Sequence, residues 1–250
     1  MSAPVRRVLG YAGAAVVMLL LWQGASTLLG SPALPAPAAA LGVLFTRFGD
    51  IAPHLGVSAV RVVASILLGL AIGAPIGLLL GRSPALDAVF GPLVFLNYPV
   101  PKVVFMPVLL VLLGIGNASI ITLITLIVFF QILVTARDAS RSIPSASVLS
   151  VRSLGADARQ VFAHVVIPAS MPEIFTALRI SSGTAVAVLF FSETIAGSTG
   201  LGYYVFDAWG RVQYSDMFAG ILAMALLGVL LYEAIEFAES QVCRWERAGR

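Results

Sequence analysis

Six long apolar runs alternate with short polar segments along the chain. Each run is long enough to cross about 30 Å of hydrocarbon as a helix. The runs lie near Val8 to Leu29, Leu55 to Leu80, Ala88 to Leu113, Ala118 to Ala136, Pro172 to Ala196 and Asp216 to Ala238. This alternation predicts an all-α integral membrane protein with six transmembrane helices.

The polar segment between the fourth and fifth runs, residues 149–168, has a defined local pattern and is more than a connector. Gly155 is placed to end a first short helix in a left-handed cap, a conformation that glycine adopts without steric cost. Asp157 can then cap a second short helix, and Gln160 completes a capping box. We therefore expect two short helices that meet at a sharp corner and protrude from the bilayer, where small residues would let a partner's cleft come close.

Three prolines interrupt the third apolar run, at Pro99, Pro101 and Pro107. Broken helices persist at membrane depth only where they are buried in protein or line a water-filled path. Asn97, Tyr98 and Lys102 lie at this break, and a charge near the bilayer centre costs about 3 kcal/mol. Lys102 could face a small anion in the path, or it could snorkel or pair structurally. We take all three residues as candidates for lining such a path.

The fifth apolar run carries a second group of path candidates, Ser192, Glu193 and Thr194. Acidic residues within a span usually face protein or water rather than lipid. Two interpretations of Glu193 stay open: it lines the path or its gate, or it bonds to a neighbouring helix end. At the other end of this run, Ser170 and Glu173 have the spacing of a capping box, which predicts that the helix begins there.

The second apolar run contains a row of glycines spaced four residues apart, Gly69, Gly73, Gly77 and Gly81. Such a row lets another helix approach to backbone contact. The row predicts close helix packing, either within this chain or at a dimer seam.

The composition agrees with a membrane protein, since 59% of residues are hydrophobic and 11% are charged, against roughly 25% charged in soluble domains. The first run exceeds the apolar core of about 7 to 15 residues in a signal peptide, so we expect a retained anchor, with a cleaved signal as the alternative. We divide the chain into an anchor and connector (1–34), an interfacial extracytoplasmic segment (35–53), a transmembrane domain (54–240) with a polar loop at 138–170, and a cytoplasmic tail (241–250).

Basic residues predict the orientation, because they cluster on the cytoplasmic side of membrane proteins. In a six-span model, one side holds Arg6, Arg7, Arg82, Arg137, Arg141, Arg152, Arg159, Arg244, Arg247 and Arg250. Only Arg47 and Arg211 lie in loops on the other side. We therefore expect both termini and the 149–168 loop in the cytoplasm. The net charge of +3 reflects this topology, and we expect no nucleic-acid partner.

The sequence lacks the motifs of an enzyme. A phosphate-binding loop needs lysine within GxxxxGK[ST], and Lys102, the only lysine, lies in Pro-Val-Pro-Lys-Val. The two histidines, His54 and His164, lie outside the apolar runs and belong to no HExxH motif. We predict no catalytic residue, no cofactor and no metal, and any ATP hydrolysis must come from a separate subunit.

The spacing of Gly155, Val165, Ile167 and Pro168 resembles the EAA coupling loop of ABC-importer permeases. The similarity covers roughly Pro35 to Trp245. It includes Asn97-Tyr98-Pro99-Val100-Pro101-Lys102, Met106-Pro107, Gly114-Ile115-Gly116, Ala177-Leu178-Arg179, Glu193 and Gly200-Leu201-Gly202-Tyr203. These motifs look like the subgroup that imports nitrate, sulfonates and taurine. The family's Glu-Ala-Ala is replaced here by Leu149, Ser150 and Val151.

The resemblance implies a type I ABC-importer permease fold in the bacterial plasma (inner) membrane, and a membrane path for a small solute. It implies an ATPase-coupling loop whose residues are Leu154, Gly155, Ala156, Asp157, Val165, Ile167 and Pro168. The implied partners are an ABC ATPase subunit, an extracytoplasmic solute-binding protein, membrane lipid and a second permease copy in a homodimer. The alternative function is a self-contained secondary transporter or channel, in which the polar loop is merely a connector.

Overall fold

The structure is a computed structural model that describes residues 3–245, and all the regular elements it describes are helical. The long helices are α1 (Ala3–Leu29), α3 (Phe48–Arg82), α6 (Asn117–Ser142), α9 (Ile167–Ala196) and α11 (Tyr214–Val242). The shorter ones are α2 (Pro37–Thr46), α4 (Pro84–Asn97), the 3₁₀-helix η1 (Lys102–Phe105), α5 (Met106–Leu113), α7 (Ser145–Ser153), α8 (Ala158–Val161), the π-helix η2 (Phe162–Val166) and α10 (Leu201–Gly210).

Four helical stretches of the described chain are long and apolar enough to cross a membrane: Phe48–Arg82, Asn117–Ser142, Ala158–Ala196 and Tyr214–Val242. A bent pair, Pro84–Asn97 with Lys102–Leu113, makes a fifth if it is counted as one span. These stretches correspond to five of the six predicted runs. The first run falls on α1, whose fully described part, Gly13–Leu29, is apolar but too short to count as a span, so the described residues show four or five of the six predicted spans.

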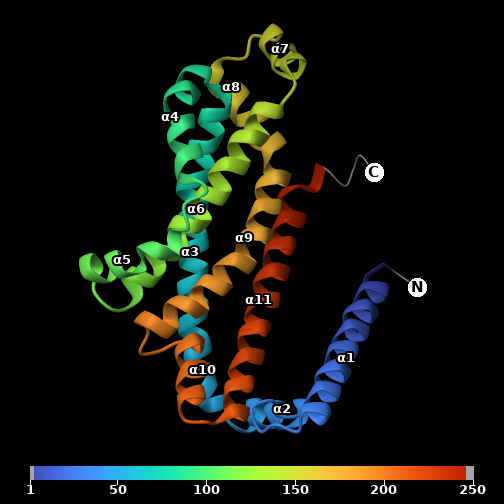
Figure 1. The fold of residues 1–250 in the computed structure, drawn as a ribbon. Coiled ribbons are helices and arrows are strands. Elements are labelled where there is room, and N and C mark those ends of the chain that lie inside the picture. Colours follow the sequence, from blue (N-terminus) through green and yellow to red (C-terminus); the bar gives the residue numbers. More distant parts are fainter. Residues whose placement is uncertain (1–2, 246–250) are drawn as a thin grey trace.

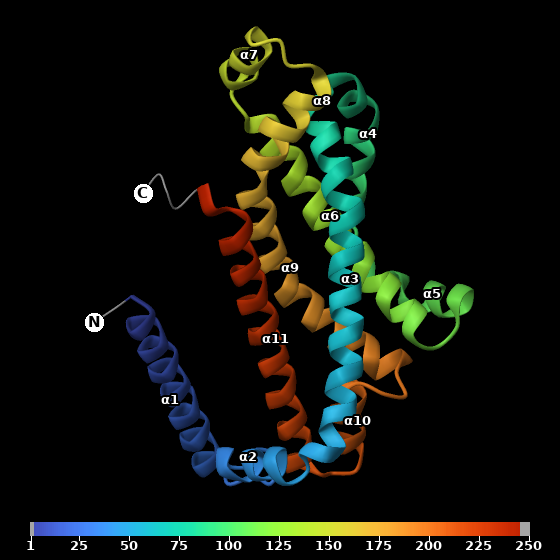
Figure 2. The same cartoon turned by 180° about the vertical axis from the view of Figure 1, so that it is seen from behind.

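Helices α3 and α6 lie side by side at the centre of the bundle (Figures 1 and 2). The glycine row of α3 allows the two helices to pack this closely. A β-carbon at Gly73 would lie 2.8 Å from the carbonyl oxygen of Phe129, and those at Gly77 and Gly81 would meet the carbonyls of Leu133 and Arg137 even more closely. Of the two predicted uses of this row, packing within the chain is therefore the one observed.

The predicted break in the third span is confirmed. Helix α4 ends at Asn97, the chain bends by 82°, and η1 and α5 follow. As a result α5 projects sideways from the central helices (Figure 1).

The predicted start of the fifth span at Ser170 is wrong. Helix α8 runs through η2 into α9, so Ser170 lies inside a continuous helical stretch, Ala158–Ala196. Its hydroxyl is buried without a hydrogen-bond partner instead of capping a helix end. A capping residue needs non-helical backbone, and Pro168, near the N-terminus of α9, continues the helix instead.

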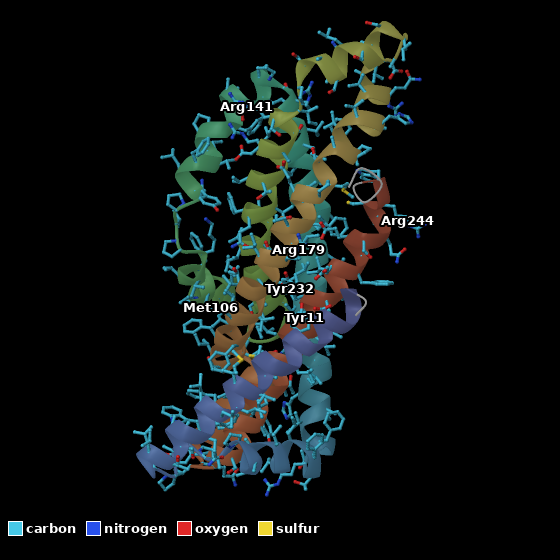
Figure 3. All side chains as sticks on the ribbon, turned by 90° about the vertical axis from the view of Figure 1, so that its right-hand side faces the viewer. Tyr11, Met106, Arg141, Arg179, Tyr232 and Arg244 are labelled. Atoms are coloured by element: carbon cyan, nitrogen blue, oxygen red, sulfur yellow. The ribbon has the colours of Figure 1, made fainter. Side chains whose placement is uncertain are left out.

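The two ends of the bundle carry different elements (Figure 1). Helices α7 and α8 lie at one end, together with the C-terminal ends of α3 and α6, whereas α2 and α10 lie at the other. Figure 3 shows Arg141 toward the α7 end and Arg179 farther along the bundle, where Arg179 pairs with Glu239 of α11. Arg247 and Arg250, in the predicted tail, lie outside the described residues, as do the side chains of Arg6 and Arg7.

The segment predicted to lie in the outer interface, residues 35–53, is divided between two helices. Helix α2 runs across the end of the bundle, packs against α11 and buries Pro37 and Ala40. The chain turns at Arg47, and Phe48 already belongs to α3. Phe45 and Phe48 both remain exposed.

Candidate functional site

The corner of the polar loop has the predicted local geometry. Gly155 follows the end of α7 with φ +90°, which confirms the left-handed conformation. Its N–H donates to the carbonyl of Arg152 at 2.9 Å. The Asp157 carboxylate accepts from the Gln160 N–H at 2.7 Å, and the Gln160 side chain accepts from the Asp157 N–H at 2.9 Å. The predicted capping box is thus also confirmed.

The seven loop residues singled out from the sequence divide into an exposed tip and a packed base. Leu154 is 88% exposed, and Gly155 and Asp157 are also exposed. Ala156, Val165 and Ile167 pack partly buried against the core, and Pro168 is also partly buried. The tip therefore projects on a base that the spans hold in place.

The residues at the break in the third span form a local cluster. The ammonium group of Lys102 donates to the backbone carbonyls of Asn97 and Tyr98 at 2.5 and 2.7 Å. It also lies 4.5 Å from the ring centre of Phe130, within cation–π range. Because these carbonyls end α4, the lysine side chain caps that helix at the bend.

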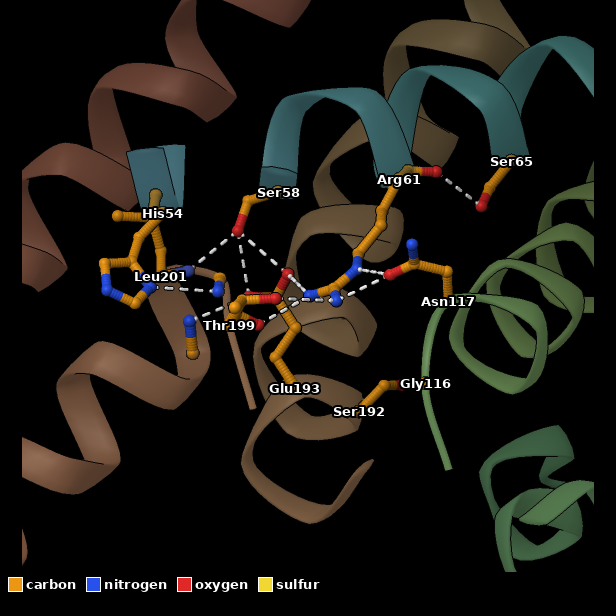
Figure 4. Close-up of polar contacts among 12 residues, drawn as sticks. His54, Ser58, Arg61, Ser65, Gly116, Asn117, Ser192, Glu193, Thr199 and Leu201 are labelled. Atoms are coloured by element: carbon orange, nitrogen blue, oxygen red, sulfur yellow. Dashed lines mark hydrogen bonds and ion pairs between the residues drawn. The ribbon is translucent and has the colours of Figure 1, made fainter. Parts of the chain in front are cut away.

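Glu193 lies in a second cluster, where α9 meets α3 and the start of α10 (Figure 4). Its carboxylate is fully buried. It pairs with the guanidinium of Arg61 at 2.7 Å and accepts from the hydroxyl of Ser58 at 2.9 Å. The N–H of Gly202 donates to the same carboxylate at 2.8 Å. Removing one partner of a buried pair typically costs about 3–5 kcal/mol, because the other charge is left uncompensated.

Arg61 is a central residue that the sequence interpretation missed. Its guanidinium also donates to the side chain of Asn117 at 2.7 and 2.8 Å and to the carbonyl of Thr199 at 2.7 Å. An arginine within the second apolar run, together with an acid in the fifth, was a usable signal, since opposite charges inside a membrane usually pair.

The six path candidates therefore lie in two separate groups. No hydrogen bond or ion pair of the described residues joins Lys102 to Glu193; each is held within its own cluster. Asn97 and Tyr98 are exposed and Thr194 is half-buried, whereas Lys102, Ser192 and Glu193 are buried. Among the described residues no three His, Cys, Asp or Glu side chains come together as metal ligands.

Comparison with known proteins assigns this chain to a family. Residues 73–239 match the family described as the binding-protein-dependent transport system inner membrane component. The taurine transport system permease protein TauC of Escherichia coli (strain K12) is 31% identical over 242 residues, which cover 93% of this chain and 88% of that protein. The putative aliphatic sulfonates transport permease protein SsuC of Bacillus subtilis (strain 168) is 27% identical over 237 residues, covering 93% and 86%.

Solved structures show the same fold. A chain of the MetNI methionine ABC transporter, solved in inward facing conformations, superposes with a TM-score of 0.63 at 21% identity, covering 80% of this chain and 96% of that one. Transmembrane components of this kind carry no ATPase site of their own. The family match and the shared fold together mean that this chain, a multi-pass membrane protein, belongs to the permease subunits of binding-protein-dependent ABC transporters.

Proposed function

We propose that this chain is the permease subunit of an ATP-driven importer and that the loop tip, Leu154 to Asp157, docks into a cleft of a separate ATPase. The observation that carries the proposal is an exposed tip on a packed base, where Leu154 and Gly155 present apolar and small surface to a partner. Arg152 and Arg159 flank the tip and are exposed, which supports a cytoplasmic position by the distribution of basic residues.

The orientation follows from that docking. With α7 in the cytoplasm of a bacterial cell, α2 and α10 face the opposite side, where a solute-binding protein would deliver its load. Six spans, with α1 as the first, bring both termini to the cytoplasm. A homodimer is the simplest assembly in which two copies enclose a path. The taurine and sulfonate permeases among the relatives favour a small oxyanion solute such as a sulfonate, taurine or nitrate.

We place the path along the break in the third span and the end of α9. Asn97, Tyr98 and Thr194 contribute exposed or half-exposed surface. Lys102 and Glu193 are buried and hold the neighbouring backbone in shape through the contacts described above, and Ser192 is buried next to Glu193 in the chain. Irregular backbone is tolerated at membrane depth only beside protein or water, which supports a path at Asn97 to Lys102.

Copurification tests the docking. The permease and its ATPase are expressed together, and ATPase retention on the tagged permease is measured in mild detergent. Leu154→Asp should lose the ATPase, whereas the matched control Leu86→Asp, an exposed leucine at the start of α4 near the same end of the molecule, should retain it. Equal retention by both variants would contradict the docking.

A further inference from the structure

The start of α10 is held by side chains from two distant spans. The N–H groups of Gly200, Leu201 and Gly202 donate to His54 Nδ1 at 3.1 Å, to the Ser58 hydroxyl at 2.8 Å and to the Glu193 carboxylate at 2.8 Å, respectively. The first N–H groups of a helix have no partner within the helix. Here α3 and α9 supply all three acceptors (Figure 4).

Arg61 makes this arrangement possible. A buried carboxylate without a cation would be too costly to keep charged, and Arg61 supplies the charge while also holding the carbonyl and hydroxyl of Thr199 at 2.7 and 3.2 Å. The same guanidinium reaches Asn117, the first residue of α6. One side chain thus joins α3, α6, α9 and the loop that leads to α10.

The backbone of that loop is shaped to fit the carboxylate. Gly200 has φ +110°, and a β-carbon there would overlap the Glu193 carboxylate. The loop can therefore approach so closely only with glycine at this position. A solute cannot contact either charged group, since the side chains of Arg61 and Glu193 are only 4% and 0% exposed.

We propose that Arg61 and Glu193 are positioning residues that fasten the start of α10 to α3 and α9. As a result, α10 moves together with these two spans at the outer mouth of the path. The contacts that fasten α10 do not depend on the proposed transport function. Only their expected effect on solute uptake rests on that function. The pair holds the mouth in shape and does not bind the solute.

The test compares amide hydrogen exchange with transport in the complete complex of permease, ATPase and binding protein. The double variant Arg61→Met/Glu193→Leu removes both charges together, so neither is left unpaired. We expect exchange in residues 198–206 to become at least tenfold faster and maximal uptake to fall at least tenfold. The half-saturating solute concentration and basal ATP hydrolysis should stay within twofold of wild type. The control Asp207→Asn/Arg211→Gln removes an ion pair at the C-terminal end of α10, where the arginine is exposed and the aspartate is partly buried, and it should change none of these.

Two results would overturn the assignment. Exchange at the wild-type rate in the double variant would mean that the pair does not fasten α10, and a raised half-saturating concentration with unchanged exchange would mean that it binds solute. If the double variant does not assemble, Ser58→Ala leaves both charges in place and removes the acceptor for the Leu201 N–H together with the hydroxyl's hydrogen bond to Glu193. Unchanged exchange at Leu201 would equally contradict the proposal. Exchange is measured without transport, so a wild-type complex that imports nothing would refute the proposed function and leave this test intact.

Discussion

The carboxylate of Asp87 receives two hydrogen bonds from the guanidinium of Arg137, at 2.5 and 2.8 Å. This pair ties the first turn of α4 to α6 close to the point where the chain leaves α6 for α7. It therefore anchors the start of α4 to α6 at the same end of the molecule as the loop tip.

Asp87→Asn should destabilise the protein by about 1.5–3 kcal/mol, the usual value of hydrogen bonds to charged groups. The control is Asp138→Asn, whose carboxylate lies 3.1 Å from the same arginine but is 61% exposed. Exposed pairs are worth less than about 1 kcal/mol. Thermal unfolding of the purified permease measures both, and equal losses would contradict the anchoring role of Asp87.

The glycine row predicts a position-dependent effect of a single methyl group. Gly73→Ala should cost about 1–3 kcal/mol, because overpacking forces α3 away from the carbonyl of Phe129. Gly228→Ala in α11 meets no atom within 4 Å and should leave the unfolding temperature unchanged or higher, since alanine favours helix. If both variants unfold like wild type, the contact between α3 and α6 is looser than described.

Gly155 tests the shape of the loop tip. Gly155→Val should uncouple ATP hydrolysis from uptake, since a branched residue in a left-handed conformation costs about 1–2 kcal/mol and reshapes the corner. Gly155→Asn should retain most coupling, because asparagine adopts this conformation readily. The ratio of solute imported to ATP hydrolysed is the measurement, and wild-type coupling with valine would argue against the corner.

Lys102→Met should lower uptake of an anionic solute at least tenfold while the ATPase is still retained. Methionine has a similar length but cannot donate to the carbonyls of Asn97 and Tyr98, so the bend beside the proposed path loses its cap. Lys102→Arg, which keeps charge and donors, should restore part of the uptake. Normal uptake with methionine would remove Lys102 from any role in the path.

The proposed orientation is tested by labelling. In a Cys243→Ser background, cysteines at Ser147 and Ser198, which are both exposed, should react with an impermeant reagent from opposite faces of the membrane. Reaction of both from one face would contradict the topology.

The features predicted correctly from the sequence are those that depend on neighbouring residues. The conformation of Gly155 and the box of Asp157 and Gln160 are decided within one turn of chain. The box at Ser170 failed because the same local pattern also fits a helix interior, and only the π-helix before it shows that the helix does not begin there.

Long-range pairing could not be deduced in the same way. Arg61 and Glu193 are 132 residues apart in the chain, and each alone indicates only a charge that must face protein or water. Their joint hold on α10 depends on the bend at Gly200 and on the approach of α3 to α9, which no local pattern encodes.

The most direct test of the account is solute uptake into proteoliposomes that contain the permease with or without its ATPase, in the presence of the binding protein. The account predicts uptake only when the ATPase is present and ATP is supplied on the side of the membrane that carries the loop tip. Uptake by the permease alone, driven by an ion gradient, would contradict it and would favour a self-contained transporter.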